Sequence, residues 1–128
     1  MDDRQELQRF AELLMRLVRD QAISNLDVYA AGRIGGAIGE HWKMVLADPA
    51  CRDAMLELLP EVVDEVLFQL LNALDNGDLP MAWRCEDASY ADLYDMGRSE
   101  MAGEFLGTDP DGWRVKHSQQ RFVHPDAG

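Results

Sequence analysis

The sequence predicts a mainly helical α+β domain, with about four N-terminal helices followed by a small C-terminal element of two or three strands. Apolar residues recur at helical spacing through the first 75 residues. Two later stretches alternate between apolar and polar side chains, as strands do. A composition of 47% hydrophobic and 28% charged residues over 128 positions fits one soluble globular domain. We expect this domain to span residues 1 to 122 and to leave residues 123 to 128 as a frayed tail.

The first predicted helix spans residues 3 to 22. Asp2 and Asp3 can cap its start, because a carboxylate accepts the free N–H groups of the first turn. An apolar stripe then recurs at helical spacing, made of Leu7, Phe10, Leu14, Leu17 and Val18. Arg16 and Arg19 are expected on the opposite, polar side. The stripe would be buried within the chain or against a second copy in a homodimer.

A second helix is predicted from a cap at Asp27 to about residue 46. It contains four glycines, at Gly32, Gly35, Gly36 and Gly39. Each interior glycine costs a helix about 1 kcal/mol relative to alanine, so four of them require a reason. We expect them to allow close approach of another helix backbone, within the chain or in a homodimer. A break near Gly35 and Gly36 is the alternative.

Two further helices are predicted on either side of Pro60. Asp48 and Pro49 are typical of an N-cap and a first helical position, and the helix they begin would run to residue 59. Proline lacks the N–H donor and clashes with the preceding turn, so Pro60 should end or kink this helix. The next helix, residues 61 to 75, carries the densest apolar stripe and should lie at the centre of the core.

The C-terminal third mixes strand and helix signals. Alternation predicts strands at residues 81 to 85 and 113 to 117, the second with Trp113, Val115 and His117 on one face. Between them, residues 89 to 94 and 100 to 106 are expected to form short helices.

Residues 108 to 112 place two aspartates beside a proline and a glycine. A calcium loop of the EF-hand type would need carboxylates where this chain has Gly107 and Ser118. Proline directly before Asp111 and Gly112 is instead typical of a tight turn, which is the structure we expect here.

The net charge of −12 is concentrated in one part of the chain. Residues 61 to 112 hold thirteen acidic residues and only two arginines, a net charge of −11. Residues 1 to 60 carry −3 and residues 113 to 128 carry +2. Such a field repels nucleic-acid backbones and attracts basic partners, so direct nucleic-acid binding is not expected. A purely solubilising role for the charge is the alternative.

No catalytic, cofactor or metal site is predicted. The glycines do not fit a GxGxxG or a phosphate-binding loop, and no serine lies in a GxSxG motif. The histidines and cysteines form no CxxC, HExxH or HxxxH pair, the usual core of a zinc site. Carboxylates that share helix faces, such as Asp92 with Asp95 and Glu100 with Glu104, are interpreted as a solvated acidic face.

The remaining polar groups are expected to have structural roles. Cys51 and Cys85 lie far apart in the sequence, and we expect both to be reduced and buried in the core. His117 is interpreted as a core or interface histidine. The sequence has no signal-like start, and no apolar run approaches the ~20 residues of a membrane span, so a cytoplasmic protein without membrane contact is expected.

The segment from LLNALDNGDLPMAWR through SEMAGEFLG to DGWRVKHSQQRF, within residues 68 to 122, carries a family resemblance. It resembles small acidic bacterial proteins of uncharacterised function, some of which are similar to immunity proteins of polymorphic toxin systems. The resemblance supplies no catalytic residue, and it implies a binding protein rather than an enzyme.

Charge and resemblance together predict a non-enzymatic module that engages a basic protein partner, as an immunity protein engages a cationic toxin. The candidate interaction surface consists of Asp87, Asp92, Asp95, Glu100, Glu104, Trp113 and Arg114. Two alternatives remain. One is a nucleic-acid mimic, whose carboxylates would be spaced like phosphates. The other is a small enzyme whose site forms only on tertiary folding.

Overall fold

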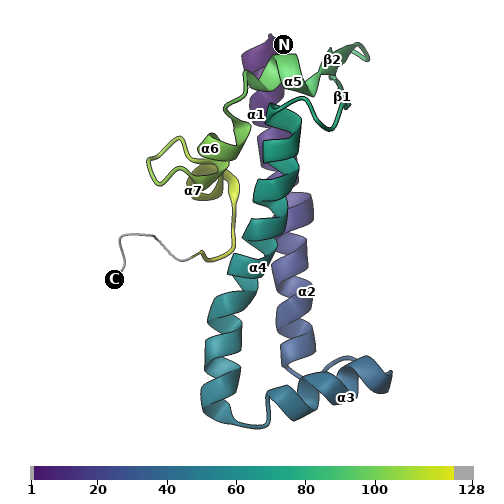
Figure 1. Ribbon diagram of the computed structural model, residues 1–128, viewed down its shortest axis with the longest axis vertical. Helices are drawn as coiled ribbons and strands as arrows, with labels where there is room; N and C mark the ends of the chain where they lie inside the picture. The colour runs from purple at the N-terminus through teal and green to yellow at the C-terminus, as the bar shows by residue number, and fades with distance from the viewer. Residues whose placement is uncertain (1, 123–128) are drawn as a thin grey trace.

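The computed structural model describes residues 2 to 122, and the predicted tail at 123 to 128 lies outside them. The described elements are α1 (Asp3–Leu13), η1 (Leu14–Arg19), α2 (Asp20–Ala30), α3 (Gly36–Val45), α4 (Pro49–Asp75), β1 (Ala82–Arg84), β2 (Tyr90–Asp92), α5 (Leu93–Gly97), α6 (Met101–Leu106) and α7 (Trp113–His117). The mainly helical α+β class is therefore confirmed, with a two-stranded sheet and more helical segments than the four expected (Figure 1).

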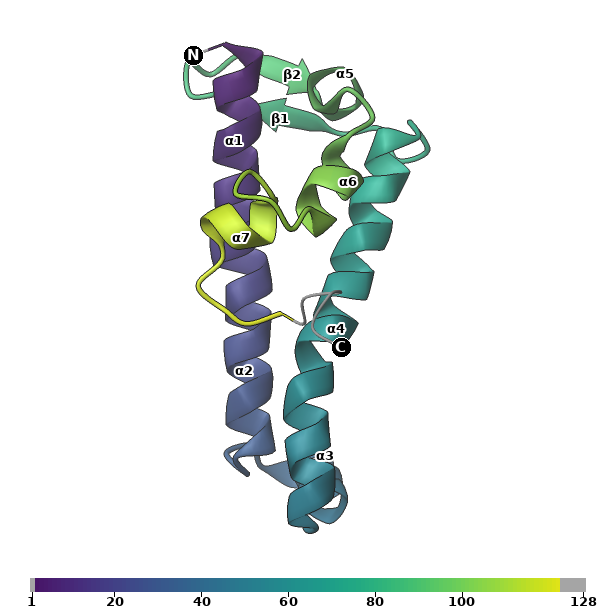
Figure 2. The same ribbon diagram turned by 90° about the vertical axis from the view of Figure 1, so that its left-hand side faces the viewer.

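The elements α1, η1 and α2 follow one another without a break and form one long rod (Figure 2). Its start is capped as expected: the Asp2 carboxylate accepts the Gln5 N–H at 2.8 Å, and the Gln5 side chain accepts the Asp2 N–H at 3.0 Å. The predicted end near residue 22 is wrong, and so is the predicted cap at Asp27, which lies inside α2. No glycine or proline interrupts the chain before Gly32, so nothing stops the helix earlier.

The π-helical segment η1 changes which side chains face inward. Leu17 and Val18, predicted to be buried, are 58% and 46% exposed, whereas Arg19 is fully buried. A π-helix uses more residues per turn than an α-helix, so the phase of the apolar stripe shifts within η1. The regular spacing from Leu7 to Leu14 therefore does not continue, and Arg19 takes the inward position.

Three of the four glycines lie at a break between α2 and α3, and Gly39 lies inside α3. Gly32 and Gly36 have φ values of +81° and +75°, the left-handed region that glycine tolerates. A methyl group at Gly32, Gly35 or Gly36 would meet nothing within 4 Å, so the predicted close backbone approach is wrong for these three. At Gly39 it would overlap the Ile34 carbonyl of the adjoining loop. The alternative of a break before Gly36 is confirmed.

The helix α4 runs through Pro60 without interruption, so the predicted division into two helices is wrong. Its start agrees with the prediction, because the Asp48 side chain accepts the Ala50 N–H at 3.1 Å and Pro49 follows. The Pro60 side chain is fully buried, and this burial helps to offset the lost backbone hydrogen bond. The helix lies antiparallel to the rod (Figure 2).

The small sheet pairs β1 and β2 in antiparallel register, with Trp83 opposite Ala91. The strand at residues 81 to 85 is thus confirmed, but residues 90 to 92 form the second strand instead of part of a helix. The hairpin is attached to the rod through Glu6, whose carboxylate accepts the Trp83 indole N–H at 2.9 Å and the Glu86 backbone N–H at 3.0 Å. The short helix predicted at residues 100 to 106 is confirmed as α6.

The predicted strand at residues 113 to 117 is wrong, because these residues form α7. Trp113 and Arg114 are both buried. Neighbouring residues of a strand point to opposite faces, whereas in a helical turn both can face inward. The tight turn before them is confirmed by a hydrogen bond from the Gly112 N–H to the Asp109 carbonyl at 3.1 Å.

The hydrophobic core lies in the half of the molecule that contains the sheet. Leu67, Leu71 and Leu74 of α4 lie there in one core cluster, and α4 packs against the rod, α5 and α6, so the central role predicted for residues 61 to 75 is confirmed. Phe10 contacts Trp83 and Trp113 edge-on, at ring-centre distances of 5.2 and 6.1 Å. In the other half, which contains α3, most side chains remain at least partly exposed.

Candidate functional site

The structure separates the seven predicted interaction residues into two groups. Trp113 and Arg114 are 0% and 6% exposed, so they do not belong to an interaction surface. The other five are carboxylates, of which Asp87, Asp92, Asp95 and Glu100 are exposed and Glu104 is half-buried. The candidate surface is therefore acidic without the aromatic and basic members that the sequence suggested.

Three of the five carboxylates lie on the β-hairpin and α5. The Asp87 carboxylate accepts the Ser89 hydroxyl at 2.6 Å and the Ser89 N–H at 2.9 Å, and these hydrogen bonds lower the pKa of Asp87. Asp92 caps α5 by accepting the Tyr94 N–H at 3.0 Å. Asp95 follows in the first turn of α5. Local hydrogen bonds thus fix Asp87 and Asp92, and the hairpin and α5 lie at one end of the molecule (Figure 1).

The other two carboxylates, Glu100 and Glu104, line a groove of about 770 Å³. The groove lies between the start of α1, the α5–α6 connection, and the turn before α7. Its charged lining residues are Asp3, Glu100, Glu104, Asp109 and Asp111 against Arg4, Arg98 and Lys116, an excess of two negative charges. We call this feature the acidic groove.

Sequence reasoning missed three of the carboxylates in the acidic groove. The sequence predicts Asp3, like Asp2, as a helix cap, and Asp109 and Asp111 as part of a turn. In the structure Asp2 is the cap and Asp3 lies in the first turn of α1, whereas the predicted turn is present. Neither local role indicates that the start of α1 lies beside the turn before α7. The only signal in the sequence was the excess of acidic residues between positions 61 and 112, which does not place them in space.

Asp75 fixes the wall of the acidic groove at the start of α6. Its carboxylate accepts the backbone N–H groups of Met101 at 3.1 Å and Ala102 at 2.8 Å, and its carbonyl accepts the Ser99 hydroxyl at 3.0 Å. These bonds hold Arg98 and Ser99 at φ values of +53° and +57°, each at a cost on the order of 1 kcal/mol. They connect the groove to the end of α4.

The Glu104 side chain is held in place by the buried Trp113. The indole N–H of Trp113 donates to one carboxylate oxygen of Glu104 at 3.1 Å. Trp113 itself is fully buried against Phe10 and the rest of the core. The tryptophan therefore positions a groove carboxylate and supports the site without contacting solvent.

Arg114 belongs to a buried cluster with Arg19 and Asp64, which we call the arginine cluster. The Asp64 carboxylate accepts the Arg19 Nε–H at 2.6 Å, an Arg19 Nη2–H at 3.1 Å and an Arg114 Nη1–H at 3.0 Å. Arg114 also donates to the carbonyls of Phe105 and Leu106, each at 3.3 Å. A buried charge is tolerated when it is paired and its hydrogen bonds are made, as they are here.

Residues 118 to 122 cross the arginine cluster as an extended segment, which we call the C-terminal strap. Arg19 donates to the Ser118 hydroxyl at 2.8 Å and to the Arg121 carbonyl at 2.8 Å. The ring of Phe122 lies 4.3 Å from the Arg114 guanidinium. Arg121 forms two hydrogen bonds of 2.9 Å with the Asp27 carboxylate, which raise the pKa of Arg121. Two C-terminal arginines thus neutralise internal carboxylates.

Cys51, Cys85, His41 and His117, the cysteines and histidines that the structure describes, form no metal site. Among residues 2 to 122, no three His, Cys, Asp or Glu side chains lie together in a way that could hold a metal ion. Cys51 is exposed and Cys85 is half-buried, so the expectation that both lie in the core is wrong. His117 is half-buried between α7 and α1, with its Nε2 3.0 Å from the Gln8 side-chain oxygen. No helix within this range is long and apolar enough to cross a membrane.

Comparison of the chain with protein-family models, curated proteins and solved structures gives no match in any of the three.

Proposed function

We propose that the protein is a non-enzymatic module that binds a basic protein partner through the acidic groove. The observation that carries this proposal is the convergence of five carboxylates, from three separate segments of the chain, around one groove of about 770 Å³. Opposite charges across an interface accelerate encounter and set orientation, and like charges exclude unsuitable partners. An immunity-type or inhibitor-type role is the most specific form of this proposal.

Cationic side chains are the ligands that suit this geometry. Carboxylates that lie at several points around a groove can each accept from one guanidinium or ammonium group, and a bidentate pair with arginine is the strongest such contact. The three basic side chains in the lining, Arg4, Arg98 and Lys116, leave an excess of negative charge for a partner to neutralise. Asp87, Asp92 and Asp95 extend the negative field beyond the groove, which would steer a basic protein toward it.

A binding experiment with a charge-matched control tests this proposal. The probe is a fluorescein-labelled octa-arginine peptide, and its anisotropy is measured against the full protein at low and at physiological salt. The groove variant combines Glu100→Gln with Asp111→Asn. The control combines Glu40→Gln with Asp53→Asn, two exposed carboxylates in the half that contains α3. Both variants remove two negative charges, so their general fields change equally.

We expect the groove variant to weaken peptide binding about tenfold and the control variant to weaken it less than threefold, since contacts within a groove outweigh a screened distant charge. Equal losses in both variants would mean that the peptide senses only the net charge, and the groove would lose its assigned role. Absence of binding to the wild-type protein at low salt would exclude the proposal altogether.

A further inference from the structure

The outer side of α4 carries an apolar stripe that no described element covers. Leu58, Val62 and Val66 follow each other at intervals of four residues and are 54%, 59% and 65% exposed. Leu67, Leu71 and Leu74 of the same helix are buried against the rod. Single exposed aliphatic residues are ordinary on protein surfaces, but three successive ones on the same helical face form a continuous strip about 12 Å long.

A row of carboxylates runs along one side of this stripe. Glu57, Glu61 and Glu65 each precede one stripe residue and are exposed. Within residues 2 to 122, none of the three forms an ion pair. We call the three aliphatic residues with these three glutamates the outer stripe.

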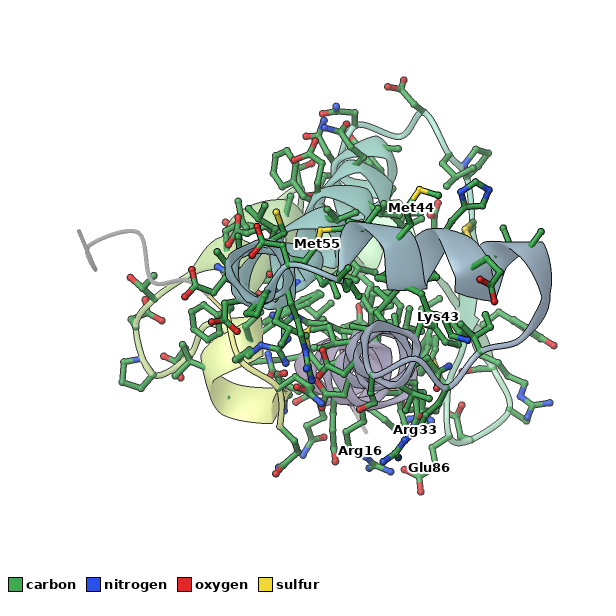
Figure 3. All side chains as sticks on the ribbon, turned by 90° about the horizontal axis from the view of Figure 1, so that it is seen from below. Arg16, Arg33, Lys43, Met44, Met55 and Glu86 are labelled. Carbon is green, nitrogen blue, oxygen red and sulfur yellow. The ribbon has the colours of Figure 1, made fainter. Side chains whose placement is uncertain are left out.

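The cations of the neighbouring elements lie on the other side of the molecule or are already paired. Arg121 donates to the Leu56 carbonyl at 2.7 Å, but its charge is paired with Asp27 at 2.9 Å. Figure 3 shows Met55, which precedes Leu58 by three residues, on the side opposite to Arg16 and Arg33. Arg16 is paired with Glu12 at 3.2 Å and Lys43 with Glu40 at 3.5 Å. The only basic residue of α4 itself is Arg52, near its start. The negative charge of the outer stripe is therefore available to an external cation.

A second copy of the chain complements this surface poorly. In an antiparallel contact about a two-fold axis at the level of Glu61, the same row of each helix meets its own copy. Glu57 would then lie opposite Glu65 of the second copy, and Glu61 opposite its equivalent. Like charges so placed oppose association, and the net charge of −12 per chain adds to this repulsion.

We infer that the outer stripe docks an amphipathic helix with a basic flank, contributed by a partner protein. The partner helix would place apolar residues at intervals of three and four on Leu58, Val62 and Val66, and lysine or arginine beside the glutamate row. This inference rests on the proposed function, because it assigns to the same basic partner a second contact outside the acidic groove.

The probe for this contact is a fluorescein-labelled 18-residue peptide of leucine and lysine, ordered to form an amphipathic helix of about five turns. One control peptide has the same composition in an order that gives no apolar face. A second replaces each lysine by glutamate. Anisotropy titrations with the full protein should give binding at least tenfold tighter for the ordered basic peptide than for either control.

Three variants locate the contact. The first variant, Val62→Asp, places an unpaired charge in the apolar stripe and should weaken binding of the ordered peptide about tenfold. The second combines Glu61→Lys with Glu65→Lys, which reverses the charge of the glutamate row, and should weaken binding by a similar factor. Val28→Asp is the matched control, because Val28 is an exposed aliphatic residue on α2. It should change binding less than twofold. All substituted side chains are exposed, and circular dichroism of each variant verifies the fold.

The outcomes separate this inference from the proposed function. Equal binding of the ordered and reordered peptides, or unchanged binding by Val62→Asp, would overturn the docking site while leaving the octa-arginine result intact. Loss of binding only in the groove variant would assign the peptide to the acidic groove and overturn it as well. A dimer in sedimentation velocity that Val62→Asp dissociates would identify a second copy as the occupant instead.

Discussion

Replacing Asp64 with alanine should destabilise the protein by about 4 kcal/mol, because it leaves two buried guanidinium groups without their shared counter-charge. Three short hydrogen bonds from Arg19 and Arg114 end on this carboxylate, which is 5% exposed. Arg19 is fully buried and cannot regain water without local unfolding. The Asp20 carboxylate, 3.9 Å from Arg19, compensates in part and keeps the loss near the middle of the expected range.

This loss is measured by urea unfolding followed by tryptophan fluorescence and by circular dichroism. A domain of this size is stable by roughly 5 to 15 kcal/mol, so the variant should lose a large share of its stability and still fold at low temperature. Asp64→Asn keeps one acceptor oxygen and should fall between wild type and alanine. Glu65→Ala is the control, because Glu65 is the exposed neighbour on the same helix.

The control should cost less than about 0.5 kcal/mol, as surface substitutions usually do. If Asp64→Ala and Glu65→Ala had the same midpoint, the arginine cluster would contribute nothing to stability, and the reasoning from burial and pairing would be refuted. A changed urea slope in Asp64→Ala, with an unchanged midpoint, would place the effect in the denatured chain.

Two further predictions concern His117 and Asp75. Burial, aided by the neighbouring Lys116 charge, lowers the pKa of His117 below 6.5, so the unfolded chain binds the proton more readily than the folded one. Stability from this group is therefore present above pH 6.5 and is lost as the pH falls toward the folded pKa. The free energy of unfolding should therefore differ less between pH 7.5 and pH 5.5 in His117→Gln than in the wild-type protein. An unchanged pH dependence would contradict this assignment. Asp75→Ala removes the acceptor for two backbone N–H groups of α6 and should cost about 1 to 2 kcal/mol in urea unfolding, with faster amide exchange at Ala102 than in wild type. Protection at Ala102 equal to that of wild type would show that another group caps α6.

Much of the fold follows from local patterns, and the departures have physical causes. The cap at Asp2, the start at Asp48 and the strand around Trp83 each depend on contacts within a few residues, and the structure has all three. The local cost of Pro60 predicts that the helix ends or kinks there. The helix continues, with the Pro60 side chain fully buried, and this burial is a tertiary effect that no local pattern contains.

The acidic groove and the arginine cluster were harder to anticipate for the same reason. Alternation over five residues cannot separate a strand from a helical turn, so it does not reveal that Trp113 and Arg114 both face inward. Asp64 lies 45 residues from Arg19 and 50 from Arg114, so the pairing leaves no spacing signal. The phase shift in η1 also hid the inward position of Arg19.

The arginine cluster has a consequence for how the chain acquires its structure. Arg19 and Asp64 are synthesised early, but the remaining partners of Arg19 lie 99 to 102 residues after it, in the C-terminal strap. Contacts between such distant positions require large loops to close and slow the folding of an otherwise helical protein. A nascent chain that lacks the strap holds an incompletely bonded arginine between the rod and α4. Completion of the arginine cluster therefore requires residues 118 to 121 to leave the ribosome.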